Sequence, residues 1–337
     1  MVITQTPFRI SFFGGGTDFP GFYEKNGGQV LSTTIDKYCY ITVRHLPPFF
    51  EYSNYIAYSK CERTANVDEI QHPAVREAMK KMDMHDLVIL YDADLPARTG
   101  LGTSSSFAVG LLSAFYALKG KYADKRRLAE EAIYLERVLC NESGGVQDQI
   151  AAAYGGFNKI VFDSSGFEVN PVVISQQKKD ELNDNFLLYF TGVSRFSSSI
   201  QVEQERNLHV KKQQLLRLKD LVDEAERSLV EDNVDDFGRL LDMEWNLKRE
   251  INGKVSNPTI DEYYKRGKAG GALGGKLLGA GGGGFLLLYV QKEKQPSVRE
   301  ALSDLMEIPF RFETGGTRIM YYVPEIYTPS KREVRMK

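Results

Sequence analysis

The sequence predicts an α+β fold of two domains. Runs of β-branched and aromatic residues are mixed with tracts that have apolar residues at helical spacing, and regular alternation of strands and helices is absent. A mixture of this kind favours an α+β arrangement over a doubly wound parallel sheet. The 337 residues and 42% hydrophobic content are enough for two ordinary domains with substantial cores.

The first half of the chain predicts a strand-rich opening followed by a group of helices. Pro, Gly or an Asp-Lys pair interrupts the apolar runs, which therefore predict separate short strands. Strands are expected at residues 2–6, 8–13, 29–35, 38–44, 87–91, 157–162 and 167–173. Helical spacing predicts a helix over residues 74–82 and two or three consecutive helices within residues 104–154.

The second half predicts a smaller mixture of helices and strands. The polar segment 175–184 is the expected boundary, so that the domains are residues 1–180 and 181–337. The charged tract 198–249 and the segment 297–306 predict helices. Strands are expected at residues 186–191, 285–289, 310–313 and 318–323.

Charge and cysteine content restrict the class of protein. The net charge of -2 argues against a dedicated binder of nucleic acid or of acidic membranes, so small metabolites are the expected partners. Cys39, Cys61 and Cys140 form no Cys-x-x-Cys pair, which argues against a disulfide framework or a thiolate metal site. Met1–Ile10 has no signal-peptide pattern, and Phe285–Val290 is too short to span a bilayer. We therefore expect a cytoplasmic protein, and the sequence leaves a homo-oligomer open.

Leu95–Ser106 is a loop rich in glycine and serine that runs into the apolar, helical segment Phe107–Leu118. At such a helix start, free backbone N–H groups and the positive end of the helix dipole both point at a ligand. The loop therefore predicts a phosphate site. The plain alternative is an ordinary capped helix that follows a turn.

Two more familiar phosphate motifs fail on their context. Gly270–Lys276 imitates a Walker A loop, but Leu277 stands where a magnesium-binding hydroxyl is required. Gly279, Gly281 and Gly284 match G-x-G-x-x-G, yet they precede a strand, whereas the dinucleotide fingerprint follows a strand and opens a helix. The triplets typical of protein kinases are absent from the sequence.

Four segments together carry a resemblance to one family. They are Pro7–Asp18, Pro96–Ser106, Glu136 with Gly144–Gln149 and Gly155–Gly156, and Lys276–Phe285. In this order and at these separations they resemble the GHMP kinase superfamily over nearly the whole chain. The resemblance implies an S5-like N-terminal domain, a ferredoxin-like C-terminal domain, and an active site between them that uses ATP and Mg²⁺.

Within the superfamily, three segments are most similar to the sugar-phosphate branch, namely Gly14–Asp18, Thr191–Arg195 and Gly315–Arg318. Galactokinases would have Glu and His at the places of Gly15 and Gly16, which counts against galactose. The resemblance implies phosphorylation of the anomeric hydroxyl of a sugar phosphate, with heptose 7-phosphate first and a free sugar such as fucose or galactose second. A non-catalytic sugar or nucleotide sensor is a remote alternative, because the chain keeps Asp148 and Glu136.

Phosphoryl transfer needs a phosphate cradle, a magnesium ligand and a group that orients the acceptor. The resemblance assigns Asp148 and Arg9 to catalysis, either as base and charge stabiliser or as orienting groups, and Ser104 and Glu136 to the metal. It assigns ATP binding to Pro96, Gly100, Leu101, Gly102, Thr103, Ser104, Ser105 and Ser106. The plain alternatives are a helix N-terminal acid for Asp148, a water-facing strand arginine for Arg9 and a solvated helix residue for Glu136.

The acceptor needs partners for its hydroxyls and for a second phosphate. Asp18 resembles the acid that grips sugar hydroxyls, because a carboxylate is a pure acceptor, and an Asx turn is its alternative. Residues 279–284 are expected to pack against the cradle. Arginine forks suit phosphate. The substrate contacts expected from the resemblance are Gly16, Thr17, Asp18, Arg98, Gly145, Arg195, Gly281, Gly282 and Arg318.

Overall fold

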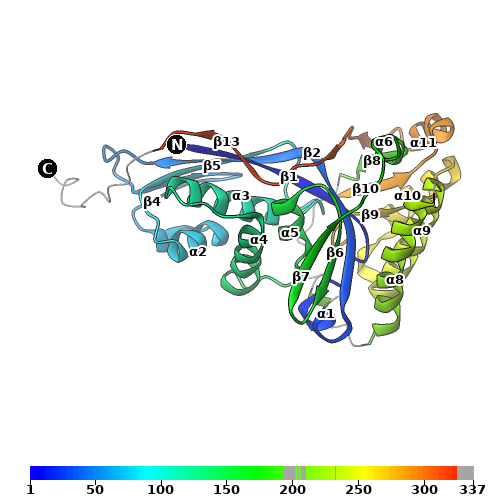
Figure 1. The fold of residues 1–337 in the computed structure, drawn as a ribbon. Helices are drawn as coiled ribbons and strands as arrows, with labels where there is room; N and C mark the ends of the chain where they lie inside the picture. The colour runs from blue at the N-terminus through cyan, green and yellow to red at the C-terminus, as the bar shows by residue number, and fades with distance from the viewer. Residues whose placement is uncertain (193–201, 204, 206–209, 232, 325–337) are drawn as a thin grey trace.

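The computed structural model describes residues 1–192, 202–203, 205, 210–231 and 233–324, which form two sheets flanked by helices (Figure 1). The α+β prediction is confirmed. The larger sheet has nine strands, with β13-β1-β2-β5-β3-β4 as its main path, and the smaller has four strands in the order β11-β8-β10-β9. Within the ranges described, no helix is both long enough and apolar enough to cross a membrane.

Two long antiparallel strands, β1 (Val2–Phe13) and β2 (Gly28–His45), form the centre of the larger sheet. The sequence predicts each of them as two short strands, and that prediction is wrong. The register of the pair shifts directly after Pro7, where Asp36 and Lys37 of β2 have no partner in the β1 ladder. Such a bulge accommodates a proline, which has no N–H to donate, so both strands continue through it.

The other strands of the larger sheet come from both ends of the chain. They are β3 (Asn54–Ala57), β4 (Cys61–Thr64), β5 (Leu87–Ala93), β6 (Phe157–Asp163), β7 (Gly166–Pro171), β12 (Phe312–Glu313) and β13 (Arg318–Tyr322). β13 pairs with β1 and β12 pairs with β2, although both follow the smaller sheet in sequence. The chain thus returns to the larger sheet after it has formed the smaller one. The domain boundary at residue 180 stays a prediction, and it concerns only the place where the chain first passes from the larger sheet to the smaller one.

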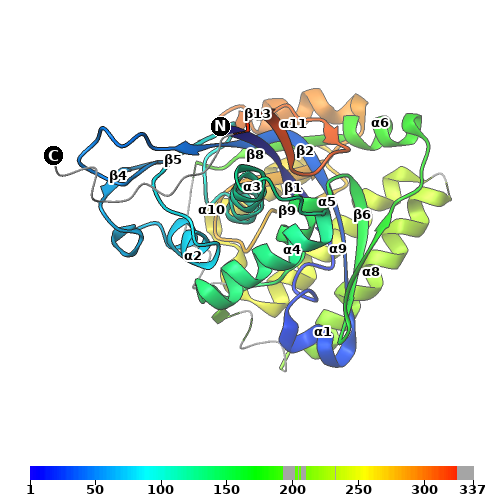
Figure 2. The same cartoon turned by 60° about the vertical axis from the view of Figure 1, so that its left-hand side comes forward.

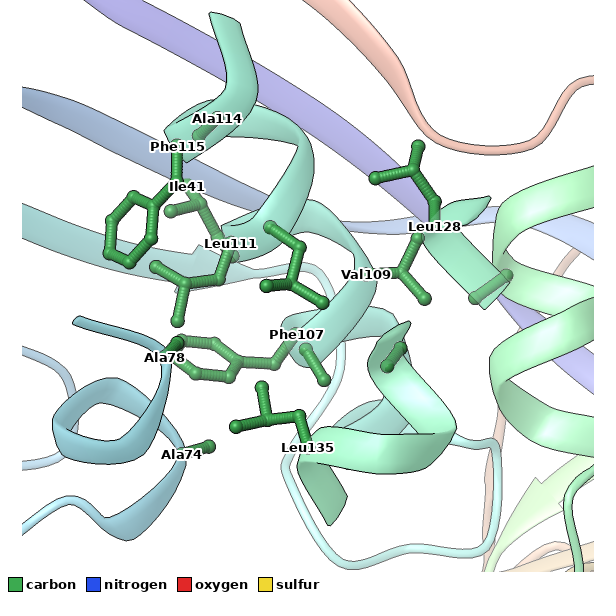
Figure 3. Close-up of a cluster of buried hydrophobic side chains, with 14 of the residues drawn as sticks. Ile41, Ala74, Ala78, Phe107, Val109, Leu111, Ala114, Phe115, Leu128 and Leu135 are labelled. Carbon is green, nitrogen blue, oxygen red and sulfur yellow. The ribbon is translucent and has the colours of Figure 1, made fainter. Parts of the chain in front are cut away.

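Helices of the first half cover one face of the larger sheet (Figure 1). They are α2 (Pro73–Lys81), α3 (Thr103–Leu118), α4 (Lys125–Tyr134), the π-helix η2 (Leu135–Leu139) and α5 (Gln147–Tyr154), while α1 (Pro20–Asn26) lies near β6. The central helix α3 buries every residue except Ser104. Figure 3 shows Phe107 of α3 directed towards α2, with Leu135 of the π-helix beside it.

The second half forms the smaller sheet and its helices. Its elements are β8 (Phe186–Phe190), α8 (Lys212–Val230), α9 (Val234–Ile251), α10 (Pro258–Gly270), β9 (Gly274–Leu277), β10 (Phe285–Tyr289), α11 (Gln295–Ala301) and β11 (Met306–Glu307). A βαββαβ order of elements with these strand neighbours is the ferredoxin-like arrangement, as expected.

Several segments differ from the sequence prediction. The segment expected as a polar boundary is helix α6 (Gln176–Asp184), whose start is capped by the Ser175 hydroxyl, which accepts from Lys178 N at 3.2 Å. The helix expected at residues 297–306 ends at Ala301. The sequence prediction did not include α1, β3, β4, α10, β9, β11 or the short 3-10 turns η1 (Val67–Glu69), η3 (Gly253–Val255) and η4 (Lys292–Lys294).

A buried apolar cluster joins the two halves of the molecule. Phe12 near the end of β1 belongs to the same cluster as Leu221 of α8, Phe237 of α9 and Phe285 of β10. The rings of Phe12 and Phe186 stack with their centroids 5.2 Å apart. In Figures 1 and 2, α8 and α9 lie at the opposite end of the molecule from β4. The segment after β1 is therefore held between the larger sheet and the second half.

Candidate active site

All four motifs of the sequence meet at one cavity of ≈ 160 Å³. Its wall includes Arg9 and Gly16 of the first motif, Ser104 of the second, Asp148 of the third and Gly281 of the fourth. These residues come from β1, the connection after it, the start of α3, the start of α5 and the loop before β10. The convergence that the resemblance requires is present in the fold.

The start of α3 forms one side of the cavity. Gly102 precedes the helix in the left-handed conformation (φ 72°), and no side chain among the described residues caps it. The first helical N–H groups therefore remain available, with the positive end of the helix dipole behind them. Gly100, Gly102, Thr103, Ser104 and Ser105 all line the cavity, which is the geometry expected of an anion cradle.

The carboxylate of Glu136 lies beside this cradle. Its side chain is 2% exposed and accepts hydrogen bonds from Ser104 Oγ at 2.6 Å, from Ser105 Oγ at 2.7 Å and from the amide of Gln149. The alternative of a solvated glutamate is wrong. Glu136 stands in the π-helix that follows α4, and such local widening of a helix is frequent at functional sites.

Arg9 and Asp148 form a forked ion pair. The guanidinium Nε and Nη2 donate to the two oxygens of Asp148 at 2.7 Å each, and Nη1 donates to the carbonyl of Gly100 at 2.7 Å. Arg9 is 4% exposed, so the alternative of a water-facing arginine is wrong. A side chain at position 102 would place its Cβ 3.2 Å from Arg9 Cγ, so Gly102 gives the pair room beside the cradle. Asp148 also lies in the first turn of α5, so the plain alternative of an acid at a helix N-terminus describes its position correctly as well.

Asp18 is almost fully buried and faces the start of α5. Its carboxylate accepts from Gly16 N at 2.8 Å and from Gln147 N at 3.2 Å. Burial raises the pKa of the Asp18 carboxyl above its ordinary value, and the charge of Asp148 raises it further. A Cβ at position 145 would lie 1.9 Å from the carboxylate, so Gly145 is needed for this close approach. The acid thus lies in the cavity wall beside the catalytic candidate.

The third glycine loop packs against the cradle, as expected. A Cβ at Gly279 would lie 2.4 Å from Gly100 Cα, and one at Gly284 would lie 2.3 Å from the carbonyl oxygen of Thr99. Both glycines have positive φ, 76° and 109°, which favours glycine on conformational grounds as well. This backbone contact fixes the second half against the loop that precedes α3.

Three residues assigned to ATP support the cradle from behind and do not line the cavity. The Ser106 hydroxyl donates to the carbonyl of Pro7 at 2.8 Å, and the Leu101 carbonyl accepts from Arg9 N at 3.0 Å. The carbonyl of Pro96 accepts a hydroxyl within the loop at 2.8 Å. Ser106 and Leu101 thus attach this segment to β1, whereas Pro96 stabilises the turn within the loop.

Two residues assigned to the acceptor also lie outside the lining of the cavity. The buried Thr17 hydroxyl contacts the carbonyl of Gln29 at 2.8 Å and thereby attaches the first motif to β2. Gly282 N donates to the carbonyl of Val255 at 2.9 Å, away from the cradle, whereas the neighbouring Gly281 lines the cavity. Thr17 and Gly282 therefore shape the site without facing it.

Of the three arginines expected at a second phosphate, the structure describes Arg98 and Arg318, and these two do not lie at the same place. Arg98 lines the cavity. Arg318 lies on β13, where its Nε donates to Gln5 Oε1 at 2.7 Å and its guanidinium lies 5.9 Å from the ring centre of Tyr38, outside the cavity lining. Arg195 lies outside the described residues. The prediction of Arg318 as a substrate contact is not supported by its position.

The closing motif Gly315–Arg318 lies between β12 and the start of β13 and contacts α5. A Cβ at Gly316 would lie 2.2 Å from the carbonyl oxygen of Ala153, and Thr317 N donates to Ala152 O at 2.9 Å. The motif therefore packs on α5, the helix that carries Asp148.

Five polar residues of the cavity wall were not among the residues assigned from the sequence. They are Ser11, Arg137, Glu142, Gln147 and Lys248. Arg137 donates to the carbonyls of Ser143 and Gly145 at 3.1 and 2.9 Å, and so shapes the loop before α5. Gln147 stands next to Asp148 and could have been found from the motif. Lys248 is one of many charged residues in the long helical tract, and no sequence signal distinguishes it.

The donor set fits a magnesium ion that is shared with a nucleotide. The described part of the chain contains no cluster of three or more His, Cys, Asp or Glu side chains that could hold a metal alone. Mg²⁺ commonly takes one or two protein carboxylates and completes its shell with phosphate oxygens and water. The Glu136 carboxylate and the Ser104 hydroxyl, 2.6 Å apart at the cradle, offer the hard oxygen atoms that such an ion needs.

Comparison with family models matches both halves of the chain. Residues 69–156 match the model described as GHMP kinases N terminal domain, and residues 225–308 match GHMP kinases C terminal. These two matches contain the start of α3, Glu136, Asp148 and the glycine loop before β10.

Individual relatives extend the match to most of the chain. This protein is 31% identical over 324 residues to a D-glycero-alpha-D-manno-heptose 7-phosphate kinase of Campylobacter jejuni, and the alignment covers 89% of this chain and 92% of that one. It is 27% identical over 338 residues to the bifunctional fucokinase/GDP-fucose pyrophosphorylase of Arabidopsis thaliana, covering 90% of this chain and 31% of that one. The crystal structure of a D-glycero-D-manno-heptose 1-phosphate kinase from Bacteroides thetaiotaomicron superposes with a TM-score of 0.78 and 25% identity, covering 97% and 100% of the two chains.

Proposed function

The chain belongs to the GHMP kinases, and from this premise we propose that it transfers the γ-phosphate of ATP to the anomeric hydroxyl of D-glycero-D-manno-heptose 7-phosphate. It is a sugar kinase, a phosphotransferase with an alcohol group as acceptor. The observation that carries the proposal is the Arg9–Asp148 pair, fixed in one cavity beside the start of α3. The product would be the 1,7-bisphosphate, a precursor for nucleotide-activated heptose.

The nucleotide phosphates belong at the start of α3. The N–H groups of Thr103, Ser104 and Ser105 lie in the first turn of the helix, where they can donate to anionic oxygens. Gly100 and Gly102 have no side chain between the loop backbone and the ligand. This assignment places the γ-phosphate at the end of the cavity where Asp148 is held.

Asp148 is the group suited to the acceptor hydroxyl. In the transfer, the acceptor oxygen forms a bond to the γ-phosphorus, the bond from that phosphorus to the bridging oxygen of ADP breaks, and the hydroxyl proton passes to Asp148 or to solvent. An acid held by two charge-assisted hydrogen bonds is fixed in orientation, which favours a productive geometry. Arg9 would also stabilise negative charge that develops on the transferred group.

Glu136 and Ser104 would hold Mg²⁺ with the nucleotide. The ion supplies charge neutralisation for the phosphate oxygens during transfer. Before binding, the Glu136 carboxylate keeps the hydroxyls of Ser104 and Ser105 oriented towards itself, so the two oxygen ligands are already adjacent. We assign Asp18, which lines the same cavity, to accept from hydroxyls of the sugar.

A free sugar such as fucose is the second candidate acceptor. It is supported by the likeness to the Arabidopsis fucokinase, which extends over 90% of this chain. Galactose is less well supported, because Gly15 and Gly16 replace the Glu and His of the galactokinase pattern. A non-catalytic sensor is disfavoured, since Asp148 and Glu136 are present and placed in the cavity.

The proposal also includes a cytoplasmic location and small-molecule partners only. Cys39, Cys61 and Cys140 are all free thiols in the structure, in agreement with a reducing compartment. The net charge of -2 gives no support to nucleic acid as a partner.

A substrate panel tests the proposed function. Purified protein is incubated with ATP, Mg²⁺ and one acceptor at a time, namely heptose 7-phosphate, heptose, fucose, galactose, mevalonate and homoserine, and ADP is measured. We expect the highest kcat/KM with heptose 7-phosphate and a product that carries a second phosphate on its anomeric oxygen. Turnover of mevalonate or homoserine without turnover of any sugar would contradict the assignment, and a preference for fucose would select the second candidate.

A further inference from the structure

We propose that Lys248, Ser11 and Gln147 form the subsite that binds the phosphate already present on the acceptor sugar. The inference rests on the proposed function and names the residues that would make this kinase select a phosphorylated acceptor. It replaces the expectation that Arg195 and Arg318 serve this purpose.

The three side chains converge above Gly15. A Cβ at position 15 would lie 3.1 Å from Lys248 Nζ, 3.5 Å from Gln147 Nε2 and 3.6 Å from Ser11 Oγ. Because Gly15 has no side chain, the space between these three polar atoms stays open, and all four residues line the cavity. An ammonium, an amide and a hydroxyl can all donate hydrogen bonds to one small anion.

Two of the three side chains have unused polar atoms. Ser11 Oγ and Gln147 Oε1 are buried, and neither has a hydrogen-bond partner among the described residues. A buried polar group without a partner is costly, so a ligand that supplies one is favoured there. The Ser11 hydroxyl can donate to a phosphate oxygen, whereas Gln147 Oε1 can accept from a hydroxyl of the sugar.

Lys248 supplies the positive charge. Within the described ranges, its ammonium has no ion pair or hydrogen bond. Glu244, one turn earlier on α9, does not neutralise it, because the Glu244 carboxylate is engaged by the buried Lys276 at 3.0 Å and by Gly14 N at 3.4 Å. Among the described residues Lys248 is therefore left without a carboxylate partner, and a phosphate would supply the negative charge that pairs with its ammonium.

The proposed subsite and the proposed ATP cradle use different residues of the one cavity. The ATP cradle is built on Gly100–Ser105 and Glu136, whereas Lys248 faces the connection after β1 and the residue that precedes Asp148. An acceptor that presents its anomeric hydroxyl to Asp148 can extend its distal phosphate towards Gly15. Arg98, which also lines the cavity, is left for the nucleotide side.

Steady-state kinetics with two acceptors tests the subsite. The Lys248→Met variant removes the charge at similar length, Lys248→Arg keeps it, and Ser11→Ala removes the hydroxyl. The matched control is Lys265→Met, which removes a charge from an exposed lysine of α10 outside the cavity. Each variant is assayed with heptose 7-phosphate, with heptose and with ATP as the varied substrate.

We expect Lys248→Met to raise the KM for heptose 7-phosphate by roughly ten- to a hundredfold, the range for loss of a hydrogen bond to a charged group. The KM values for heptose and for ATP should stay within about twofold, as should all constants of Lys265→Met. Lys248→Arg should retain most of the affinity, and Ser11→Ala should shift the same constant in the same direction.

Four outcomes would overturn the inference. Equal increases in KM for both acceptors would indicate a general effect on the site, and an increase confined to ATP would assign Lys248 to the nucleotide. A wild-type enzyme that turns over heptose 7-phosphate, with unchanged constants in Lys248→Met and Ser11→Ala, would remove the subsite while leaving the proposed function intact. Wild-type protein without turnover of any sugar phosphate would instead end the proposed function, and the subsite with it. Melting curves of all variants identify any that fail to fold.

Discussion

The Arg9 guanidinium holds the Asp148 carboxylate through two parallel hydrogen bonds of 2.7 Å, and this fork decides what Asp148 can do. A carboxylate held at both oxygens cannot rotate freely, so Asp148 has a fixed orientation in the wall of the cavity that it lines. Because Arg9 also contacts the Gly100 carbonyl, the same guanidinium ties the acid to the loop of the cradle. One buried arginine thereby fixes the position of Asp148 relative to the loop before α3.

Replacing Asp148 by Asn should lower kcat by about 10²–10⁴-fold, the usual contribution of a group that transfers or orients the reacting proton. The KM for ATP should change little, because the amide keeps the shape of the residue and the cradle is built from other residues. Steady-state kinetics with ATP and the best acceptor measures both constants. Asp220→Asn, an exposed change on α8, is the control, and wild-type turnover in Asp148→Asn would remove Asp148 from the mechanism.

The sequence could assign residues that belong to a motif, but not their burial. Asp148, Arg9, Asp18 and Glu136 were all found by their motif positions, and the structure brings them to one cavity wall. From helix position alone, Glu136 would be expected in water, since an isolated glutamate in a helix is usually solvated. Lys248 could not be found, because what distinguishes it is the absence of a side chain at Gly15, far away in the chain.

At the scale of elements, the loop before β10 and the loop before α3 pack directly against each other. Gly279 and Gly100 are in contact through backbone alone, and Gly284 lies against the carbonyl of Thr99. The first loop belongs to the C-terminal half and the second carries the cradle. The conformation of the cradle is therefore set in part by a segment that follows it by about 180 residues in the sequence.

Replacing Gly279 by Ala should displace the cradle. The new Cβ would lie 2.4 Å from Gly100 Cα and would adopt φ near 76°, so both contact and backbone strain oppose it. We expect a loss of roughly 1–3 kcal/mol in the free energy of unfolding and a higher KM for ATP. Urea denaturation and nucleotide kinetics measure the two effects.

Gly253→Ala is the matched control, because a Cβ there meets no atom within 4 Å. Its stability and its KM for ATP should remain close to those of the wild type. If Gly279→Ala behaved like Gly253→Ala, the contact between the two loops would have no part in shaping the nucleotide site.

The elements that sequence reasoning missed fall into two groups. Helix α10 has visible signals, since Asn257 caps it by accepting from Ile260 N at 3.1 Å, Pro258 opens it and Gly271 ends it. Strand β9 has none, because it begins with two glycines, which are disfavoured in strands. The structure uses them for contact, since a Cβ at Gly274 would lie 2.0 Å from the carbonyl oxygen of Gly238 in α9. Tertiary packing, which local propensity does not contain, selects this strand.

At the scale of the whole molecule, a buried ion pair connects the two halves. Lys276 of β9 contacts Glu244 of α9 at 3.0 Å and donates to the carbonyl of Phe12 in β1 at 2.6 Å, while Glu244 accepts from Gly14 N at 3.4 Å. Burial lowers the pKa of Lys276 from 10.5 to about 7, although the charge of Glu244 acts in the opposite direction. The residue that imitates the Walker lysine is thus a structural link and does not line the cavity.

Stability should depend on pH through Lys276. Between about pH 7 and pH 10.5, the lysine of the unfolded chain binds a proton that the folded chain binds only partly. The unfavourable contribution of this buried charge is therefore fully present below about pH 7, and the free energy of unfolding rises with pH across that window. Urea denaturation of the wild type at pH 7, 8 and 9 measures the rise.

The double variant Lys276→Met/Glu244→Gln provides the reference, because it has no ionisable group at this position while Gln can still accept from Gly14 N. The difference in unfolding free energy, wild type minus double variant, should increase with pH. Parallel pH profiles would show that Lys276 titrates as an ordinary lysine. The single variant Lys276→Met is not a suitable reference, since it leaves the Glu244 carboxylate buried without its cation.

The return of the chain to β1 and β2 has a consequence for biosynthesis. A ribosome releases the N-terminal residues first, but β12 and β13 complete the larger sheet only after residues 312–322 have emerged. Until then, the outer edge of β1 exposes unpaired N–H and C=O groups that can recruit a strand from another nascent chain. The larger sheet therefore stays incomplete while the first half folds during translation. A chaperone that covers the edge of β1 until β13 has paired with it would lower the risk of aggregation.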